Sequence, residues 1–541
     1  MLNYWNRNRR EIIAFLLLFT ALLLRISWFG FSYNLQLDDY IHYRDLAAGT
    51  DPVQVCIEKG LFTSRPLAGL MDLVFWGRFP AFLGSVLLCI LYAASGVLFW
   101  KLFSGLFGTG TFFLAVYALL PLGFEGTYWH AAATRIIPAL FFAALAVTSL
   151  SRFIETERKL HLLPFLGWSL LSFCFYEQTL VLSLALSLML TLLRLLQKKW
   201  HALWGLTVFA PVGIYAAVTG YFSTLADGQL ANRMDLMLPN DPEFFTTHME
   251  SVMDQLDAAF VDGGWLTMSR GFVRGLELIV SESVWTAVLI PTFAVGVYLL
   301  LRRCAPETVK LGWIEPVFAI LAAIAPLTPF VILAKPWICL RSTVPSFLGL
   351  ALLADWLVRL LLRKRTAALT ALFTAACLIA SVSELYDYRA VAQTNEQVAK
   401  VILAADEAHD FTGKVGILGL NQLYTGEQNY QYRDHVMSAH ASDWALTGLL
   451  RYYHPDSVID FTPVPLATDA EAFWYTWSKP TKNLDHFETL LLYDHASGTM
   501  EPLTAERGEG EEWFLYDSSG SLRGRVWEES KDLGRIEFYN E

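Results

Sequence analysis

Two adjacent acidic residues, Asp38 and Asp39, follow shortly after the first hydrophobic segment of the chain. Two like charges held this close raise each other's pKa, so the pair carries an electrostatic cost. A carboxylate in such a place can accept the proton of an attacking hydroxyl group. Two together can bind a divalent cation such as Mg²⁺ or Mn²⁺, and either can form an Asx turn or a helix cap. The residues alone leave these roles open.

Two further side chains stand beside the acids in the sequence. If a helix begins at this point, Asp39 and Tyr43 lie four residues apart on one face, and His42 follows Asp39 by three residues. We therefore predict Asp38 and Asp39 as catalytic residues, with His42 and Tyr43 next to them at the substrate. The same two acids would be the ligands of a metal ion.

Three arginines and one lysine are suited to hold a phosphate group. The guanidinium group of arginine binds phosphate through two parallel hydrogen bonds. Arg65 stands late in the first predicted outer loop, and Arg135 stands at the outer entrance of the fourth predicted membrane segment. In either place a basic side chain can also simply reach lipid headgroups. Lys335 and Arg341 share a short loop on the predicted outer side, where basic residues are disfavoured. We predict that all four bind substrate.

Three more charged residues fall within or beside apolar segments. Glu177 stands at a tight predicted turn at membrane depth, where a carboxylate is either functional or the partner of an arginine. Asp355 and Arg359 are four residues apart in one apolar segment, which is the spacing of an ion pair on a helix. We predict Glu177 as a substrate-binding residue and the other two as a structural pair.

Composition indicates an integral membrane protein. Of the 541 residues, 55% are hydrophobic and only 17% are charged, whereas soluble domains average about 25% charged residues. From residue 385 onward the sequence contains 26 acidic and 12 basic residues, while the preceding part is slightly basic. We therefore predict a membrane domain over 1–384 and an acidic soluble domain over 385–541. The acidic balance argues against nucleic acid as a partner.

Eleven segments are predicted as membrane helices, which need about 20 apolar residues each. They cover residues 11–29, 80–101, 106–123, 136–152, 162–176, 178–196, 203–222, 284–301, 313–333, 343–362 and 366–384. Every second connection is rich in Lys and Arg, which predicts a cytoplasmic N-terminus and an extracytoplasmic 385–541 domain. No small-residue cleavage site follows the first segment, so we expect an uncleaved helix in the plasma (inner) membrane.

Two long outer loops are expected, at 30–79 and at 223–283. The first holds the acidic pair, and the second contains amphipathic stretches at 244–260 and 272–280 that suit the membrane surface. Cys56 and Cys339 both fall in outer loops, where a disulfide between them is one option.

The soluble domain is expected to be a small α/β or α+β fold. A helix is predicted at 388–408, followed by short strands that Gly, Pro and Asp-Ser clusters separate. The predicted strands are 415–420, 489–493, 513–516, 523–527 and 535–538.

With these features the chain resembles the GT-C superfamily of integral-membrane glycosyltransferases. The resemblance rests on the predicted cytoplasmic N-terminus, on Asp38 and Asp39 in the first outer loop, on Arg65 late in that loop, and on Arg341 in a late outer loop. It covers about residues 1–384. Within the superfamily the chain is similar to bacterial O-antigen glucosyltransferases of the phage type, and more distantly to protein mannosyltransferases and lipid A aminoarabinose transferases.

The resemblance implies that a sugar passes from a polyprenyl phosphate to an acceptor on the outer face of the membrane. An acid of the first outer loop would act as base or metal ligand, and Arg341 with Arg65 or Arg135 would hold the carrier phosphate. The acceptor would be an envelope glycan, lipid or protein. A transporter or flippase of lipid-linked sugars and a non-enzymatic envelope scaffold stay open as alternatives. A transporter favours two related halves with charged groups near the middle of the membrane.

Overall fold

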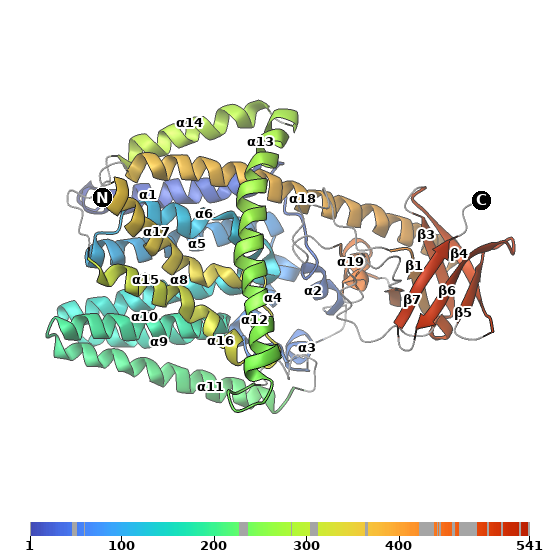
Figure 1. The fold of residues 1–541 in the computed structure, drawn as a ribbon, viewed down its shortest axis with the longest axis horizontal. Coiled ribbons are helices and arrows are strands. Elements are labelled where there is room, and N and C mark those ends of the chain that lie inside the picture. Colours follow the sequence, from blue (N-terminus) through green and yellow to red (C-terminus); the bar gives the residue numbers. More distant parts are fainter. Residues whose placement is uncertain are drawn as a thin grey trace. The chain divides into compact units, whose positions relative to one another are not determined.

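The computed structural model divides the chain into two units (Figure 1). Unit 1 contains Met1–Tyr33 and Val53–Tyr386, and unit 2 contains Asn34–Pro52 and Asp387–Glu541. The structure describes residues 2–45, 51–58, 60–226, 236–282, 284–302, 312–362, 366–420, 438–440, 442, 445–456, 460–464, 484–494, 497–509, 512–529 and 532–538.

The boundary predicted at 384/385 lies close to the division between the two units. The acidic pair, however, was predicted to belong to the membrane part, and the structure groups Asn34–Pro52 with the C-terminal residues instead.

Unit 1 is a bundle of helices. Its α-helices are α1 (Leu2–Ser27), α3 (Pro52–Glu58), α4 (Pro66–Arg78), α5 (Ala81–Phe107), α6 (Phe112–Leu119), α7 (Phe124–Tyr128), α8 (His130–Thr156), α9 (Leu162–Phe175), α10 (Glu177–Leu196), α11 (Phe209–Ser223), α12 (Met249–Asp257), α13 (Gly271–Glu282), α14 (Val284–Leu301), α15 (Ile314–Ile324), α16 (Thr328–Ile332), α17 (Phe347–Leu362) and the first part of α18 (Thr366–His409). Short 3-10 helices extend or join them at Leu61–Thr63, Pro121–Gly123, Lys159–His161, Trp200–Val208, Ala325–Leu327 and Leu340–Ser346.

Each of the eleven predicted membrane segments contains helix, although residues 108–111 interrupt the predicted segment 106–123. The structure is therefore consistent with the predicted helical membrane protein. Seven helices in the described part of the chain are long and apolar enough to cross a membrane: Ala81–Phe107, His130–Thr156, Glu177–Leu196, Trp200–Ser223, Ile314–Ile332, Leu340–Leu362 and Thr366–His409. Three more apolar helices are shorter, at Phe112–Tyr128, Lys159–Phe175 and Trp285–Leu301. The predicted number of eleven spans, and the sidedness, stay predictions.

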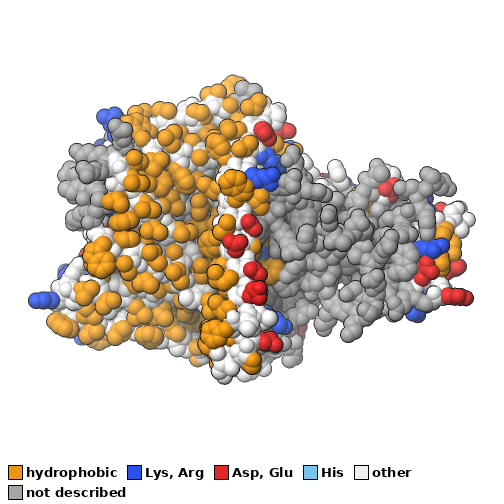
Figure 2. Space-filling view, viewed as in Figure 1, with side chains coloured by type: hydrophobic (Ala, Val, Ile, Leu, Met, Phe, Trp, Pro, Cys, Tyr) orange, Lys and Arg blue, Asp and Glu red, His pale blue; other side chains and the backbone are white. Residues whose placement is uncertain are grey.

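The predicted loop 223–283 contains a long amphipathic helix. Helical segments follow one another from Phe244 to Glu282, with π-helical turns between α12 and α13, and Figure 1 shows them running across the direction of the bundle helices. In Figure 2 a row of acidic side chains lies along this helix beside hydrophobic ones. Exposed apolar residues such as Trp265 and Val280 accompany exposed acids such as Glu250 and Asp254. This is the pattern of a helix that lies at a membrane surface.

A glycine fixes this crossing helix to the bundle. A Cβ atom at Gly275 of α13 would lie 2.1 Å from the carbonyl oxygen of Ile379 in α18, whereas at Gly264 it would meet nothing within 4 Å. We predict that Gly275→Val lowers the free energy of unfolding by about 1–3 kcal/mol through overpacking. Gly264→Val, the matched control on the same helix, is expected to leave it within about 0.5 kcal/mol. Unfolding of both variants in mixed detergent–SDS micelles measures this, and equal midpoints would contradict the close packing.

The predicted ion pair of Asp355 and Arg359 is confirmed and has a third member. Arg359 Nε donates to Asp355 Oδ2 at 2.6 Å, and Arg359 Nη2 also pairs with Glu315 of α15. All three side chains are fully buried. The backbone N–H of Gly110 donates to Asp355 Oδ2 at 2.7 Å. Charges buried this deeply are stable only when paired and hydrogen-bonded, so the group joins α15 and α17 to the segment just before α6.

The C-terminal part of unit 2 begins with the end of α18, which continues without a break from the last predicted span. No Gly or Pro interrupts Thr366–His409, so nothing in the sequence stops the helix where the apolar segment ends. It stops only at Asp410, whose positive φ of 48° gives a left-handed cap. The separately predicted helix at 388–408 is therefore part of the same element as the predicted span 366–384.

A seven-stranded sheet forms most of the rest of unit 2. Its strands are β1 (Lys414–Leu418), β2 (Asp460–Pro463), β3 (Thr489–Asp494), β4 (Thr499–Arg507), β5 (Glu512–Tyr516), β6 (Leu522–Glu529) and β7 (Asp532–Phe538), in the order β2-β1-β3-β4-β5-β6-β7. β1 runs parallel to β2 and β3, and the later strands are antiparallel. The hydrophobic core of the sheet includes Leu418, Leu490, Leu503 and Trp513.

The five predicted strands are all present, and two were missed. β4 pairs with a strand on either side although it contains Pro502 and three charged residues, a composition that argues against a central strand. β2 is only four residues long. Helix α19 (Leu446–Tyr453) was also missed, and with α2 (Asp39–Asp45) it packs within unit 2.

Candidate functional site

Unit 1 brings three arginines and three carboxylates together in one group, which we call the arginine cluster. Its members are Arg65, Arg135, Arg341, Asp72, Glu125 and Glu177. They come from five separate elements: the start and the middle of α4, α7, α8, the start of α10, and the 3-10 helix Leu340–Ser346. Four of the six were predicted as substrate-binding residues from the sequence.

Arg65 and Glu177 form a fork-shaped ion pair. Arg65 Nε donates to Glu177 Oε2 at 2.6 Å, and Arg65 Nη2 donates to Glu177 Oε1. The guanidinium also lies over the ring of Tyr176, 4.6 Å from its centre. Tyr176 has extended backbone, which ends α9 and makes Glu177 the first residue of α10. A carboxylate at a helix N-terminus is favoured by the helix dipole. The interruption of the helix at Tyr176 therefore fixes the position of Glu177 in the ion pair.

Arg341 is held near Glu125 and Trp129. Its Nη1 lies 3.4 Å from Glu125 Oε1, its backbone N–H donates to Glu125 Oε2 at 3.3 Å, and its guanidinium lies 5.5 Å from the ring centre of Trp129. A Cβ atom at Gly126 would lie 3.0 Å from the Cα of Arg341. Glycine therefore lets α7 approach the loop that carries Arg341. The ion pair with Glu125 is longer than the fork at Arg65.

Arg135 of α8 pairs with Asp72 of α4 at 3.1 Å. Its Nε is buried and makes no hydrogen bond among the described residues. Arg135 also acts electrostatically on Glu177, and Arg341 on Arg65. The three ion pairs therefore form one electrostatic group.

The cluster has the chemistry of an anion site. Each arginine side chain keeps between 19% and 27% of its surface exposed, whereas the carboxyl groups of Asp72 and Glu125 are almost fully buried. Each guanidinium carries five N–H donors, and the buried Nε of Arg135 makes no hydrogen bond among the described residues. Guanidinium groups can bind a phosphate through parallel hydrogen bonds.

Lys335 does not join the cluster. It is exposed in the segment between α16 and the 3-10 helix that carries Arg341, and within the described ranges its side chain makes no ion pair or hydrogen bond. The two basic residues of the predicted loop therefore have different surroundings.

Asp72 and Glu125 were missed, although the sequence carries a signal for both. Each is a single acid within an apolar stretch, and both are buried, at 2% and 3% exposure. An ionisable residue at membrane depth is a functional candidate by default. Asp72, however, fell in the predicted outer loop 30–79 and Glu125 just beyond the predicted segment 106–123, so the argument that selected Glu177 did not reach them.

The acidic pair lies in unit 2, at the start of α2, and its members differ. Asp39 is fully buried, and its Oδ2 accepts the backbone N–H of Gln36 at 2.8 Å. The side-chain amide of Gln36 in turn donates to the carbonyl of Tyr388 in α18, at 3.1 Å. Asp38 is half-buried. Asp39 thus has the local structural role that acids often take at turns, and Asp38 is the more accessible carboxylate.

Of the two predicted neighbours, His42 is buried and Tyr43 is half-buried. Burial, Tyr452 of α19 and the carboxylate of Asp39 together raise the pKa of the Tyr43 hydroxyl. Burial also raises the pKa of Tyr40, with further contributions from Tyr453 and Asp39. Both phenols therefore stay protonated at neutral pH and can donate hydrogen bonds.

Two further predictions concern a metal and a disulfide. Across the described ranges, no three His, Cys, Asp or Glu side chains are arranged to hold a metal ion. The role of Asp38 and Asp39 as metal ligands stays a prediction. Cys339 is a free thiol, 3.5 Å from the hydroxyl of Ser342. The optional disulfide between Cys56 and Cys339 is therefore not formed.

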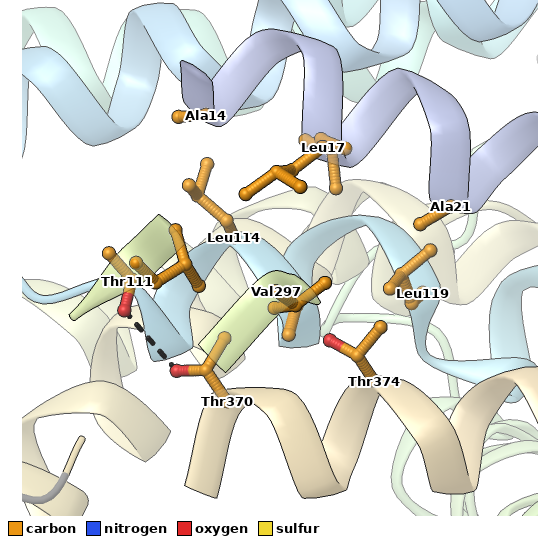
Figure 3. A pocket seen from close by; sticks show the side chains of 12 residues that line it. Ala14, Leu17, Ala21, Thr111, Leu114, Leu119, Val297, Thr370 and Thr374 are labelled. Carbon is orange, nitrogen blue, oxygen red and sulfur yellow. Dashed lines mark hydrogen bonds between the residues drawn. The ribbon is translucent and has the colours of Figure 1, made fainter. Parts of the chain in front are cut away.

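A cavity of about 30 Å³ lies among α1, α6, α14 and α18 (Figure 3). Aliphatic side chains line it, together with Thr374 and with Thr111 and Thr370, whose hydroxyls are 3.3 Å apart. None of its lining residues belongs to the arginine cluster. Ligand sites usually measure about 300–1,000 Å³, so this is a packing gap between helices.

Searches of protein-family models, of curated proteins and of solved structures find no match for this chain.

Proposed function

We propose that this chain is an integral-membrane glycosyltransferase. It moves a sugar from a polyprenyl-phosphate donor to a cell-envelope acceptor on the outer face of the plasma membrane, with inversion at the anomeric carbon. The arginine cluster is the observation that carries the proposal, because it gathers three guanidinium groups from distant parts of a membrane-type bundle.

The donor phosphate binds at Arg341 and Arg65 in this proposal. The two guanidinium groups act on each other as like charges, and an anion between them would offset that repulsion. Arg341 forms an ion pair with Glu125 at 3.4 Å and keeps 27% of its side chain exposed, so its guanidinium is accessible to a phosphate. Arg65 is held by Glu177 in a fixed orientation, and Arg135 adds a third positive charge nearby.

The reaction needs one base and no external energy source. An acceptor hydroxyl oxygen attacks the anomeric carbon, the bond from that carbon to the phosphate oxygen breaks, and polyprenyl phosphate leaves with the electron pair. Asp38 takes the proton of the hydroxyl as a general base. The arginines stabilise the negative charge that develops on the leaving phosphate.

A transporter or flippase is the main alternative. Such a protein needs charged groups that exchange partners as its halves move. The buried group of Arg359, Asp355 and Glu315 is enclosed, and backbone N–H groups also hold Asp355. This arrangement favours a fixed structural role and gives the alternative no support.

Native mass spectrometry of the gently purified protein tests donor binding. With synthetic polyprenyl phosphate added, we expect a bound carrier in the wild type and about tenfold less in Arg341→Ala, since a hydrogen bond to a charged group is worth about 1.5–3 kcal/mol. Arg194→Ala is the control, because Arg194 is also ion-paired in unit 1, with Glu155 at 3.0 Å, but lies outside the cluster. A wild type that binds no carrier, or equal binding by Arg341→Ala, would overturn the donor site.

A further inference from the structure

Helices α2 and α19 of unit 2 pack unusually closely although about 400 residues separate them in the sequence. A Cβ atom at Gly448 of α19 would lie only 1.9 Å from the carbonyl oxygen of Tyr40 in α2. Arg451 Nη1 donates to the carbonyl oxygen of Arg44 at 2.6 Å. Glycine at 448 and this hydrogen bond fix how the two helices meet.

The contact brings tyrosines of both helices together. The rings meet edge to face. The ring centres of Tyr43 and Tyr452 are 4.9 Å apart, those of Tyr452 and Tyr453 are 5.0 Å apart, and the buried Tyr40 lies 6.1 Å from Tyr452. We call Tyr43, Tyr452 and Tyr453 the tyrosine platform.

The platform is exposed, and this distinguishes it from a core. Tyr452 keeps 40% of its surface exposed, and Tyr43 and Tyr453 are half-buried. Among the described residues of unit 2, Tyr452 is the one large hydrophobic side chain that is exposed to this degree. Large aromatic side chains left at a surface in a fixed arrangement often mark a binding site.

The surroundings are polar and acidic. Asp39 acts electrostatically on Tyr43, Asp38 precedes it at the start of α2, and His454 follows the platform directly, exposed to solvent. Burial and the neighbouring Glu396 and Tyr452 raise the pKa of Tyr453 to about 12. The tyrosine hydroxyls therefore stay neutral hydrogen-bond donors next to carboxylate acceptors.

We propose that the tyrosine platform binds the sugar rings of a glycan, which is the acceptor class of this protein. The C–H face of a pyranose ring packs on the electron-rich face of an aromatic ring, while sugar hydroxyls need donors and acceptors at its edge. The inference rests on the proposed function only in naming the glycan as acceptor.

A glycan fits this surface better than a peptide or a lipid surface. Peptides commonly add to a strand edge or fill an apolar groove, whereas the platform is formed by two helices and carries hydroxyl groups. A membrane surface favours Trp, aliphatic and basic side chains. Here the exposed aromatic side chains are tyrosines, and acidic residues accompany the two arginines of the helix contact, Arg44 and Arg451.

Saturation-transfer NMR on the full-length protein in nanodiscs tests the inference without any donor. The probes are soluble hexamers of α-linked glucose, β-linked glucose and N-acetylglucosamine. We expect at least one to receive saturation on its ring protons, with at least a fivefold weaker signal in Tyr452→Ala. Tyr452→Phe, which keeps the ring, should retain most of the signal, and Tyr298→Ala on α14 in unit 1 serves as a control that should change nothing.

Each outcome decides a separate question. No saturation of any of the three hexamers, or an equal signal in Tyr452→Ala, would overturn the platform as a glycan site. The same two results are expected if a peptide or lipid occupies the platform. Glycan binding without carrier binding in the mass-spectrometry test would retain the platform and overturn the proposed glycosyl transfer. Carrier binding without glycan binding would overturn the platform as a glycan site and retain the proposed glycosyl transfer.

Discussion

Replacing Asp38 by Asn will lower the rate of sugar transfer by about 100- to 10,000-fold, which is the usual contribution of a general base. The amide cannot accept the proton of the acceptor hydroxyl, but it has the size of the carboxyl group. Asp38 is half-buried, so the loss of one charge there should leave the fold intact. Transfer of labelled sugar from a synthetic polyprenyl-phosphate donor, together with the melting temperature in detergent, measures both effects.

Asp39→Asn is the matched control for this prediction. Asp39 Oδ2 accepts the N–H of Gln36, and an amide oxygen can accept the same hydrogen bond. We therefore expect less than a tenfold loss of rate from this variant. The opposite ranking of the two variants would assign the base to Asp39, and normal transfer by both would make the proposed mechanism wrong and favour a transporter or a scaffold.

The local features of the fold could be predicted because the sequence carries them directly. Apolar segments of sufficient length gave the helices, and the amphipathic pattern gave the helix between Phe244 and Glu282. The spacing of Asp355 and Arg359 gave their ion pair. In each case the residues that interact lie within a few turns of one another.

Features that depend on distant contacts could not be predicted in the same way. Nothing in residues 34–52 indicates that they group with the C-terminal unit, since the contact with α19 depends on Gly448. Likewise, the sequence suggests that Arg65 or Arg341 needs a partner, but not that Glu177 pairs with the first and Glu125 with the second. Pairings of this kind depend on how the helices pack.

Removing Arg65 will destabilise unit 1, because it leaves the carboxylate of Glu177 without its counter-charge. Breaking a buried ion pair costs about 3–5 kcal/mol. The two side chains keep 23% and 27% of their surfaces exposed, so we expect Arg65→Ala to lie near the lower end, at about 3 kcal/mol. Unfolding in mixed detergent–SDS micelles gives this value.

The double variant Arg65→Met/Glu177→Leu separates stability from function. With both charges gone, no unpaired ion remains at the start of α10, and replacing a buried pair by apolar residues is often neutral or stabilising. Stability should therefore return close to that of the wild type, while carrier binding in native mass spectra stays lost because the guanidinium is absent. If the double variant binds polyprenyl phosphate as well as the wild type does, Arg65 contributes only to the fold, and the phosphate site must be built from Arg135 and Arg341 alone.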